Sequence, residues 1–264
     1  MPMKDILLKP LDQPVYTLEA EVVKPDDFAG KSIEEILELE VYYGNRVGKL
    51  RDFFDVSGEA PDNPEELRIV IDGDISRIKR IGQKMKAGEI FVKGSAGMYV
   101  GALMEGGKIT VEGNVDSFSG MMMRGGEIYI KGDAGEYLGC TYRGDRLGMR
   151  GGIIIVEGNS GMETGQFLNG GKIIIKGNTG AFTGVHMKKG MIVVDGKAGV
   201  RTGGQMTGGA IVVKGEIESL LPGFDLDKRV ENPSIENEPF NGSFDKYSGD
   251  SAEKGAKGSL YVKI

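Results

Sequence analysis

The sequence predicts an all-β fold, a single-stranded right-handed parallel β-helix of about seven to eight coils of 19 residues. Two observations predict it. A glycine closes each of eight short β-branched runs, and most of these glycines stand 19 residues apart. Within the runs, aliphatic residues recur at every second position, which is typical of a strand that buries one face. A unit this short buries its apolar side only by stacking on its neighbours.

The closing glycines also reveal where the repeat is irregular. They are Gly73, Gly94, Gly113, Gly132, Gly158, Gly177, Gly196 and Gly215. The intervals between them are 21, 19, 19, 26, 19, 19 and 19 residues, so one unit carries two extra residues and another carries seven. Insertions in a solenoid map to loops on one face, which makes the seven-residue insertion the main irregularity of the coils.

The periodic block predicts three parts in the chain: a small α/β cap and its connection to the coils over residues 1–66, the glycine-rich β-helix over 67–221, and an irregular tail over 222–264. In the cap, residues 15–18 and 20–23 look like strands. Ser32 followed by Glu35 predicts a capped helix. The tail ends in an expected strand over 260–264. Because the open ends of a β-helix expose strand edges, we expect both flanks to cover them.

In the coils, the second and fourth residues of each strand are expected inside and the third outside. The later coils carry Ile155, Ile174, Val193 and Val212 at the third position, which is too apolar for a solvated stripe. We expect a cover there, either the tail or a partner protein. One residue of each turn is expected to fill the interior as an unbranched ladder rather than a metal site. This ladder comprises Met85, Met104, Met123, Met149, Leu168, Met187 and Met206.

Glycines spaced as Gly-x-x-Gly-x-x-x-Gly follow most strands, for example Gly158, Gly161 and Gly165. A phosphate-binding loop has a similar composition, but it occurs once, between a strand and a long helix. Here the pattern recurs in five units with no helix in reach. The glycines are therefore interpreted as corners of stacked coils.

Composition excludes several classes of function. The net charge of −6 and the pI near 5.1 argue against nucleic acid as a partner. The first ten residues lack the apolar region of a signal peptide, and no run of 18 apolar residues occurs. We expect a cytoplasmic protein without membrane contact. The single cysteine, Cys140, forms no internal disulfide and cannot hold an iron–sulfur cluster alone.

The seven-residue insertion lies within residues 140–150. Arg143, Asp145, Arg146 and Arg150 make it locally basic in an acidic chain. These residues are the predicted partner interface, suited to an acidic protein surface or to an anion. The alternative is a solvated loop whose charges have no partner.

Candidates for catalysis are few. Cys140 has no histidine near it in sequence, and the one histidine, His186, is expected at the surface or in an interface. Carboxylates at strand ends could form a groove like that of β-helix carbohydrate enzymes. However, the position alternates in sign, which favours a stabilising charge ladder: Lys93, Glu112, Lys131, Glu157, Lys176, Asp195 and Lys214. We assign no catalytic, cofactor-binding or metal-binding residue.

Residues 40–220 carry a resemblance to known proteins. The glycine turns followed by Met-x-Gly-Gly and an isoleucine-rich strand resemble the β-helix at the C-terminal end of the glutamate synthase large subunit. They resemble more closely the C-subunit family of formylmethanofuran dehydrogenase, because residues 43–54 (YGNRVGKLRDFF) and 70–85 (VIDGDISRIKRIGQKM) look like that family's approach to its β-helix.

The resemblance implies a non-catalytic scaffold subunit of a methanogen enzyme complex that reversibly reduces CO2 and forms N-formylmethanofuran. It implies that the cofactors lie on partners: a tungsten- or molybdenum-pterin subunit with iron–sulfur clusters, an amidohydrolase-like subunit with a dinuclear metal site, and ferredoxin-like subunits. In that role the apolar stripe of the later coils, the insertion and the tail would contact those partners. The alternatives are a structural subunit of a glutamate synthase-like amidotransferase and a separate carbohydrate-active enzyme.

Overall fold

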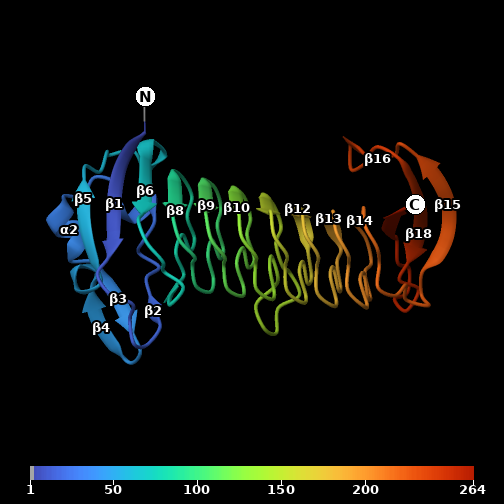
Figure 1. Cartoon of the computed structure of the whole chain (residues 1–264), viewed down its shortest axis with the longest axis horizontal. Coiled ribbons are helices and arrows are strands. Elements are labelled where there is room, and N and C mark those ends of the chain that lie inside the picture. The colour runs from blue at the N-terminus through green and yellow to red at the C-terminus, as the bar shows by residue number, and fades with distance from the viewer. Residues whose placement is uncertain (1–2) are drawn as a thin grey trace.

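One long sheet organises the molecule. A computed structural model describes residues 3–264, and its main sheet has 13 strands in the order β15-β18-β19-β14-β13-β12-β11-β10-β9-β8-β6-β1-β5. The strands from β1 to β19 in this order are parallel, and antiparallel strands are added at both ends. The result is a rod in which the N-terminal and C-terminal segments lie at opposite ends (Figure 1). This confirms the predicted mostly β class.

Each 19-residue repeat contributes one strand to the parallel part. These strands are β8 (Glu89–Val92), β9 (Lys108–Val111), β10 (Glu127–Ile130), β11 (Ile153–Val156), β12 (Asn169–Ile175), β13 (Lys189–Val194) and β14 (Ala210–Val213). Equivalent positions pair directly; Ile90, for example, pairs with Ile109. Seven parallel bridges from Ile75 to Ile217 join the same repeats along a second line. Successive repeats therefore stack in register on two sides.

The interior follows the predicted pattern. The second and fourth residues of every coil strand are buried, from Ile90 and Val92 to Ile211 and Val213. The ladder of six methionines and Leu168 has no exposed surface at any rung. Unbranched side chains fill a narrow space without polar partners. The ladder is therefore part of one continuous core that runs into both caps.

The corners of the coils use left-handed backbone in two columns of residues that are not glycine. One column comprises Arg80, Tyr99, Phe118, Tyr137, Glu163, Phe182 and Arg201; the second comprises Lys84, Leu103, Met122, Phe167, His186 and Gln205. Between them stands a glycine such as Gly165, where an added Cβ would lie 2.5 Å from Cδ1 of Ile192. Close contact with the next coil therefore demands glycine there.

A ladder of acceptor side chains follows the closing glycines on the outer surface. The Oδ1 atoms of Asn114, Asp133 and Asn159 accept backbone N–H groups of the next coil at 2.8, 2.7 and 2.9 Å. Asn178 continues the ladder to the N–H of Lys197 at 2.7 Å. These bonds satisfy backbone donors at a turn and fix the register of adjacent coils.

The N-terminal cap surrounds the first coil. Its elements are β1 (Lys4–Pro10), β2 (Leu18–Glu19), α1 (Pro25–Phe28), α2 (Ile33–Leu37), β3 (Glu40–Tyr43), β4 (Arg46–Lys49), a 3₁₀ turn (Leu50–Asp52), β5 (Phe54–Gly58), a second 3₁₀ turn (Pro64–Glu66), β6 (Leu67–Ile71) and β7 (Ile78–Lys79). The expected capping box is present, since Ser32 and Glu35 bond each other's backbone N–H groups. Strands β4, β3, β2 and β7 form a second sheet.

The two extra residues of the first coil connect this second sheet to the rod. The offset between equivalent residues is 21 at the bridge between Ile75 and Ala96, and 19 between the corner residues Arg80 and Tyr99. The surplus therefore lies within residues 76–79. These residues include β7, which pairs with β2.

The strands expected over residues 15–18 and 20–23 are mostly wrong. Only Leu18–Glu19 is a strand, because the chain turns at once. The N–H of Val23 bonds the carbonyl of Ala20 at 3.0 Å, and Pro25 then begins α1.

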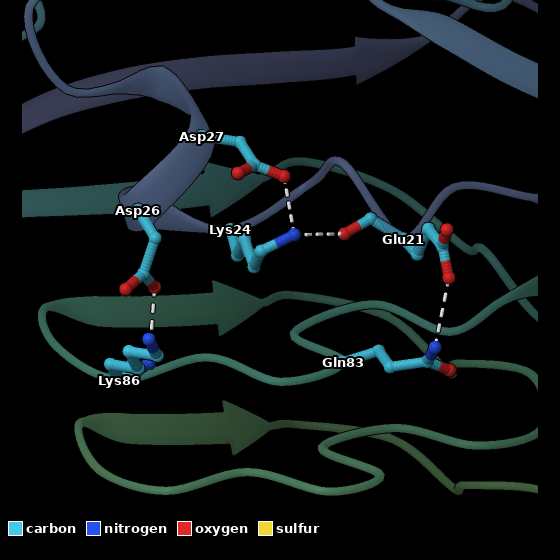
Figure 2. A network of polar contacts seen from close by, with 6 residues as sticks. All are labelled: Glu21, Lys24, Asp26, Asp27, Gln83 and Lys86. Atoms are coloured by element: carbon cyan, nitrogen blue, oxygen red, sulfur yellow. Dashed lines mark hydrogen bonds and ion pairs between the residues drawn. The ribbon is translucent and has the colours of Figure 1, made fainter.

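Polar contacts around α1 attach the cap to the first coil (Figure 2). Nε2 of Gln83 donates to Glu21 at 2.8 Å, and the backbone N–H of Lys86 donates to Asp26 at 3.1 Å. Within the cap, Lys24 pairs with Asp27 and also donates to the carbonyl of Glu21. These contacts fix the cap on the edge of the coil stack, as the sequence predicts for a flank that covers open strand edges.

The C-terminal tail closes the other end and covers the apolar stripe. Its strands are β15 (Asp225–Glu231), β16 (Ser234–Ile235), β17 (Glu238–Pro239), β18 (Ser243–Gly249) and β19 (Gly258–Lys263), which confirms the expected final strand. Ile235, Phe240 and Phe244 pack on Val193 and Val212, which are 3% and 0% exposed. The expectation that a partner protein binds this part of the stripe is therefore wrong, because the tail already occupies it.

Candidate partner interface

The seven-residue insertion forms the one coil loop that projects beyond its neighbours in the described chain. It lies between β10 and β11 and is the yellow-green loop at the lower edge of the rod in Figure 1. A turn closes it, in which the N–H of Asp145 bonds the carbonyl of Tyr142 at 2.9 Å. Oγ1 of Thr141 donates to the carbonyl of Leu147 at 3.2 Å and so joins its two ends. The loop is thus folded on itself.

An aromatic stack runs along the coils up to this loop. The rings of Tyr99, Phe118 and Tyr137 occupy the first left-handed corner column, with centroids 5.1 and 4.8 Å apart and nearly parallel planes. The guanidinium of Arg80 lies over the outer face of Tyr99, 4.9 Å from the ring centroid. The stack covers a buried patch of Ala102, Met121 and Cys140. Stacked rings and a cation–π contact stabilise this surface.

A pocket of about 550 Å³ opens where the aromatic stack meets the insertion. Tyr99, Phe118 and Tyr137 form one wall, residues 141–145 form another, and Glu163, Gln166 and Phe167 come from the next coil. A concave site with aromatic walls and a few polar groups is the usual form of a binding site. The pocket is therefore the candidate functional site.

The four predicted interface residues are placed differently from one another. Arg143 and Asp145 line the pocket. Arg146 is exposed, and its carbonyl accepts a bond from Nζ of Lys188 at 3.4 Å. Arg150 is half-buried at the base of the loop, and its Nε has no hydrogen-bond partner among residues 3–264. Only two of the four residues thus belong to the pocket.

Glu163 is a site residue that sequence reasoning missed. It takes the corner position at which the three preceding coils carry aromatic rings, and the amide of Gln166 bonds its carboxylate. Burial raises the pKa of Glu163 above its usual range. The charge of Glu163 in turn raises the pKa of Tyr137. Aligning the coils on their corners, instead of on their strands, would have singled out this glutamate.

The candidate nucleophile Cys140 is buried beneath the aromatic stack. Its thiol donates to the carbonyl of Thr141 at 3.2 Å, and burial raises its pKa to about 12. A protonated thiol is neither a nucleophile nor a metal ligand. His186 lies two coils away and stacks on the ring of Phe167 with a centroid distance of 4.5 Å. Desolvation lowers the pKa of His186. The structure thus brings neither residue a catalytic partner.

The carboxylates at the strand ends are engaged with neighbouring coils. Asp195 lies 3.4 Å from Lys176 and 2.8 Å from Lys214, and Glu112 pairs with Lys131. The hydroxyl of Tyr129 donates to Glu157 at 3.1 Å. This arrangement confirms the interpretation of the alternating signs as a charge ladder.

Metal ligation finds no support in the part of the chain that is described. No group of three or more histidine, cysteine, aspartate or glutamate side chains is placed to hold a metal ion within residues 3–264. The protonated Cys140 does not fit a pterin-bound metal or an iron–sulfur cluster. None of the helices within this range is long and apolar enough to span a membrane.

Comparison with known proteins places the chain in a family. It is 67% identical over 262 residues to the C subunit of the tungsten-containing formylmethanofuran dehydrogenase 2 of Methanothermobacter thermautotrophicus, covering 99% of this chain and 97% of the relative. It is 57% identical over 100 residues to the protein of that name in Methanothermobacter wolfeii. That match spans 38% of this chain and about a third, 37%, of the relative. No protein-family model matches the sequence.

A solved structure supports the same assignment. One chain of the crystal structure of the formyltransferase/hydrolase complex FhcABCD from Methylorubrum extorquens, in complex with methylofuran, superposes with a TM-score of 0.86 at 27% identity. The match covers 98% of this chain and 99% of that one. With two thirds of its residues shared with a full-length relative, this chain belongs to the C-subunit family of formylmethanofuran dehydrogenase.

Proposed function

We propose that this chain is the non-catalytic scaffold subunit of a formylmethanofuran dehydrogenase, the complex that reversibly reduces CO2 and forms N-formylmethanofuran in methanogenesis. The observation that carries the proposal is the state of its few reactive groups. The single cysteine is buried and protonated, the single histidine is stacked on a ring, and the ladder carboxylates are paired. Chemistry needs accessible groups at matched pKa values.

We infer that the coil stack is a right-handed parallel β-helix. Its support is the parallel register of successive strands, one for each repeat, since parallel crossovers are right-handed in nearly all proteins. The division into a cap over residues 1–66, a β-helix over 67–221 and a tail over 222–264 belongs to the same proposal. The continuous core and the pairing of β6 with β8 favour one rigid body.

Cofactors and chemistry are assigned to partner chains in this proposal. These partners are a tungsten- or molybdenum-pterin subunit with iron–sulfur clusters, an amidohydrolase-like subunit with two metals, and ferredoxin-like subunits. The support is the name of the relative in Methanothermobacter thermautotrophicus together with a donor set in this chain that does not fit a metal. The assembly is proposed to be cytoplasmic and to contact neither nucleic acid nor a membrane.

Two surfaces are proposed to bind those partners. The first is the insertion with Arg143, Asp145, Arg146 and Arg150 and the pocket behind it. The second is an apolar patch on the N-terminal cap, where Val15, Tyr16, Tyr42 and Val47 are 68%, 65%, 48% and 59% exposed. Large apolar side chains gathered on a surface mark sites of protein association.

Anaerobic purification of the tagged chain from its native host tests the proposal. We expect it to recover the other subunits with tungsten or molybdenum, and the sample to reduce a dye with formylmethanofuran as substrate. A variant lacking residues 141–147 should recover fewer of these subunits while remaining folded. Recovery of the intact chain alone, without metal, would refute the scaffold role.

A further inference from the structure

The first corner column changes character at the pocket. Phe118 stacks on one face of Tyr137, but the next coil places Glu163 rather than a ring at the equivalent corner. The ring of Tyr137 lines the pocket together with that carboxylate. The aromatic stack therefore ends at a cavity that holds a carboxylate next to a ring.

The charge of this carboxylate is not balanced by a cation of the described chain. Glu163 forms no ion pair among residues 3–264, and its hydrogen-bond donor is the neutral amide of Gln166. Of the charged side chains that line the pocket, Arg143 is positive, and Asp145 and Glu163 are negative, which gives a net charge of −1. Glu136 lies close enough to raise the pKa of Glu163 further. The interior of the pocket therefore favours a cation.

The chain itself shows which cation suits the column. At one end of the column the guanidinium of Arg80 stacks on Tyr99, and near the other end Arg201 stacks on Phe182 at 5.3 Å. A planar guanidinium stacks on an aromatic face and pairs with a carboxylate at the same time, which an ammonium does less well.

Apolar side chains surround the opening of the pocket. Within the coils, the exposed large apolar residues are Tyr142, Leu147 and Met162, at 62%, 36% and 39%, and all three lie on the insertion or the coil that follows it. An apolar rim around a charged interior is the form of a protein contact with one anchoring side chain.

We propose that the pocket binds an arginine side chain of a partner subunit, stacked on Tyr137 and paired with Glu163. This inference rests on the proposed function, since it names the chemistry by which the insertion binds another subunit. The apolar rim then contacts the residues on both sides of that arginine. An acidic segment is the opposite occupant, and the charges of Glu163 and Arg143 distinguish the two.

Binding measurements on charge variants test the proposal. The purified chain is immobilised, and the complex lacking this subunit is titrated over it to give a Kd. Glu163→Gln removes the proposed partner of the arginine and should weaken binding about tenfold or more. Arg143→Gln removes a repelling charge and should tighten binding several-fold. Glu216→Gln, the same charge change at an exposed site away from the pocket, should leave Kd within about twofold.

A site-specific cross-link identifies the occupant. A photoreactive phenylalanine analogue replaces Tyr142 on the rim, and the cross-linked peptide is expected to contain an arginine. Exchanging the two charges, with Glu163→Arg in this chain and arginine to glutamate in the partner, should restore the Kd that either change alone weakens. All variants should keep the melting temperature within a few degrees, which separates lost binding from lost folding.

The outcomes that overturn the proposal are distinct from failure of the scaffold role. Unchanged Kd for Glu163→Gln, or weaker binding for Arg143→Gln, would exclude an arginine in the pocket. A cross-linked peptide without arginine would do the same. If the wild-type chain does not bind the remaining subunits at all, the proposed function itself fails.

Discussion

Residues at the left-handed corners carry an energetic cost that the stack offsets. A bulky residue in this region costs about 1 kcal/mol or more. Each corner N–H donates to a carbonyl of the next coil; that of Tyr137, for example, bonds Met162 at 2.9 Å. Ring stacking between Phe118 and Tyr137 adds to this. Inter-coil bonds thus keep large side chains where isolated turns would place glycine or asparagine.

The acceptor ladder makes a prediction for Asn159. Replacing it by alanine removes the Oδ1 that binds the N–H of Asn178, and also the 3.1 Å bond from its own Nδ2 to Asp133. We expect Asn159→Ala to lower the free energy of unfolding by about 1–2 kcal/mol. Urea denaturation measures this. Asn45→Ala, at an exposed hairpin tip, is the control and should change stability by less than about 0.5 kcal/mol.

Cys140 should be unreactive while the chain is folded. Its folded pKa of about 12 exceeds the ordinary 9.0, so at pH 8 the folded chain holds about a thousandfold less thiolate than the unfolded chain. Because the folded pKa is raised, the stability linked to this thiol is fully present below pH 9 and is lost as the pH rises toward 12. A chromogenic disulfide reagent measures the rate of modification in buffer and in urea. Equal rates would contradict the burial of Cys140.

Periodicity revealed some residues of this fold and concealed others. The interior methionine ladder was predictable because residue type and spacing recur together from Met85 to Met206. Glu163 was not, because its role depends on a left-handed φ and on contacts between coils, which composition does not encode. The acceptor ladder left a readable signal in the residue after each closing glycine, namely Ser95, Asn114, Asp133, Asn159 and Asn178.

At the scale of elements, both flanks are built into the long sheet. The sequence showed two surplus residues in the first coil, but only the structure shows that they form β7 and pair with β2. The tail could be predicted to cover something. Its target, Val193 and Val212, depends on how β18 folds back along β19. Contacts between segments distant in sequence decide such points, and one sequence does not report them.

The tail's contact with the stripe predicts a large effect for Phe244. This side chain is 1% exposed and packs over the outer face of the last coils. Phe244→Ala should destabilise the protein by about 3 kcal/mol through lost burial and a cavity. Leu226→Ala on the exposed β15, where the side chain is 59% accessible, should have little effect. Thermal melts compare the two, and equal melting temperatures would show that the tail is not packed on the stripe.

For the whole molecule, the sequence resemblance and the comparisons agree on the family, whereas the site came from the structure. The insertion was visible as seven extra residues. The pocket behind it needed the aromatic stack of the three preceding coils and Glu163 of the following one. Half of the predicted interface lies elsewhere, since Arg146 points to solvent and Arg150 lies at the loop base. A rigid rod with an anchoring pocket and an apolar cap surface is suited to organise partners.

Turnover of the assembled complex tests the central claim, that this chain organises an enzyme without taking part in its chemistry. The double variant Cys140→Ala, His186→Gln removes the only thiol and the only imidazole of the chain. Complex containing it is purified, its subunit and metal content are confirmed, and kcat for formylmethanofuran oxidation is measured. We predict a kcat within about twofold of the wild type. A kcat reduced a hundredfold at unchanged subunit and metal content would show that this chain supplies a catalytic group.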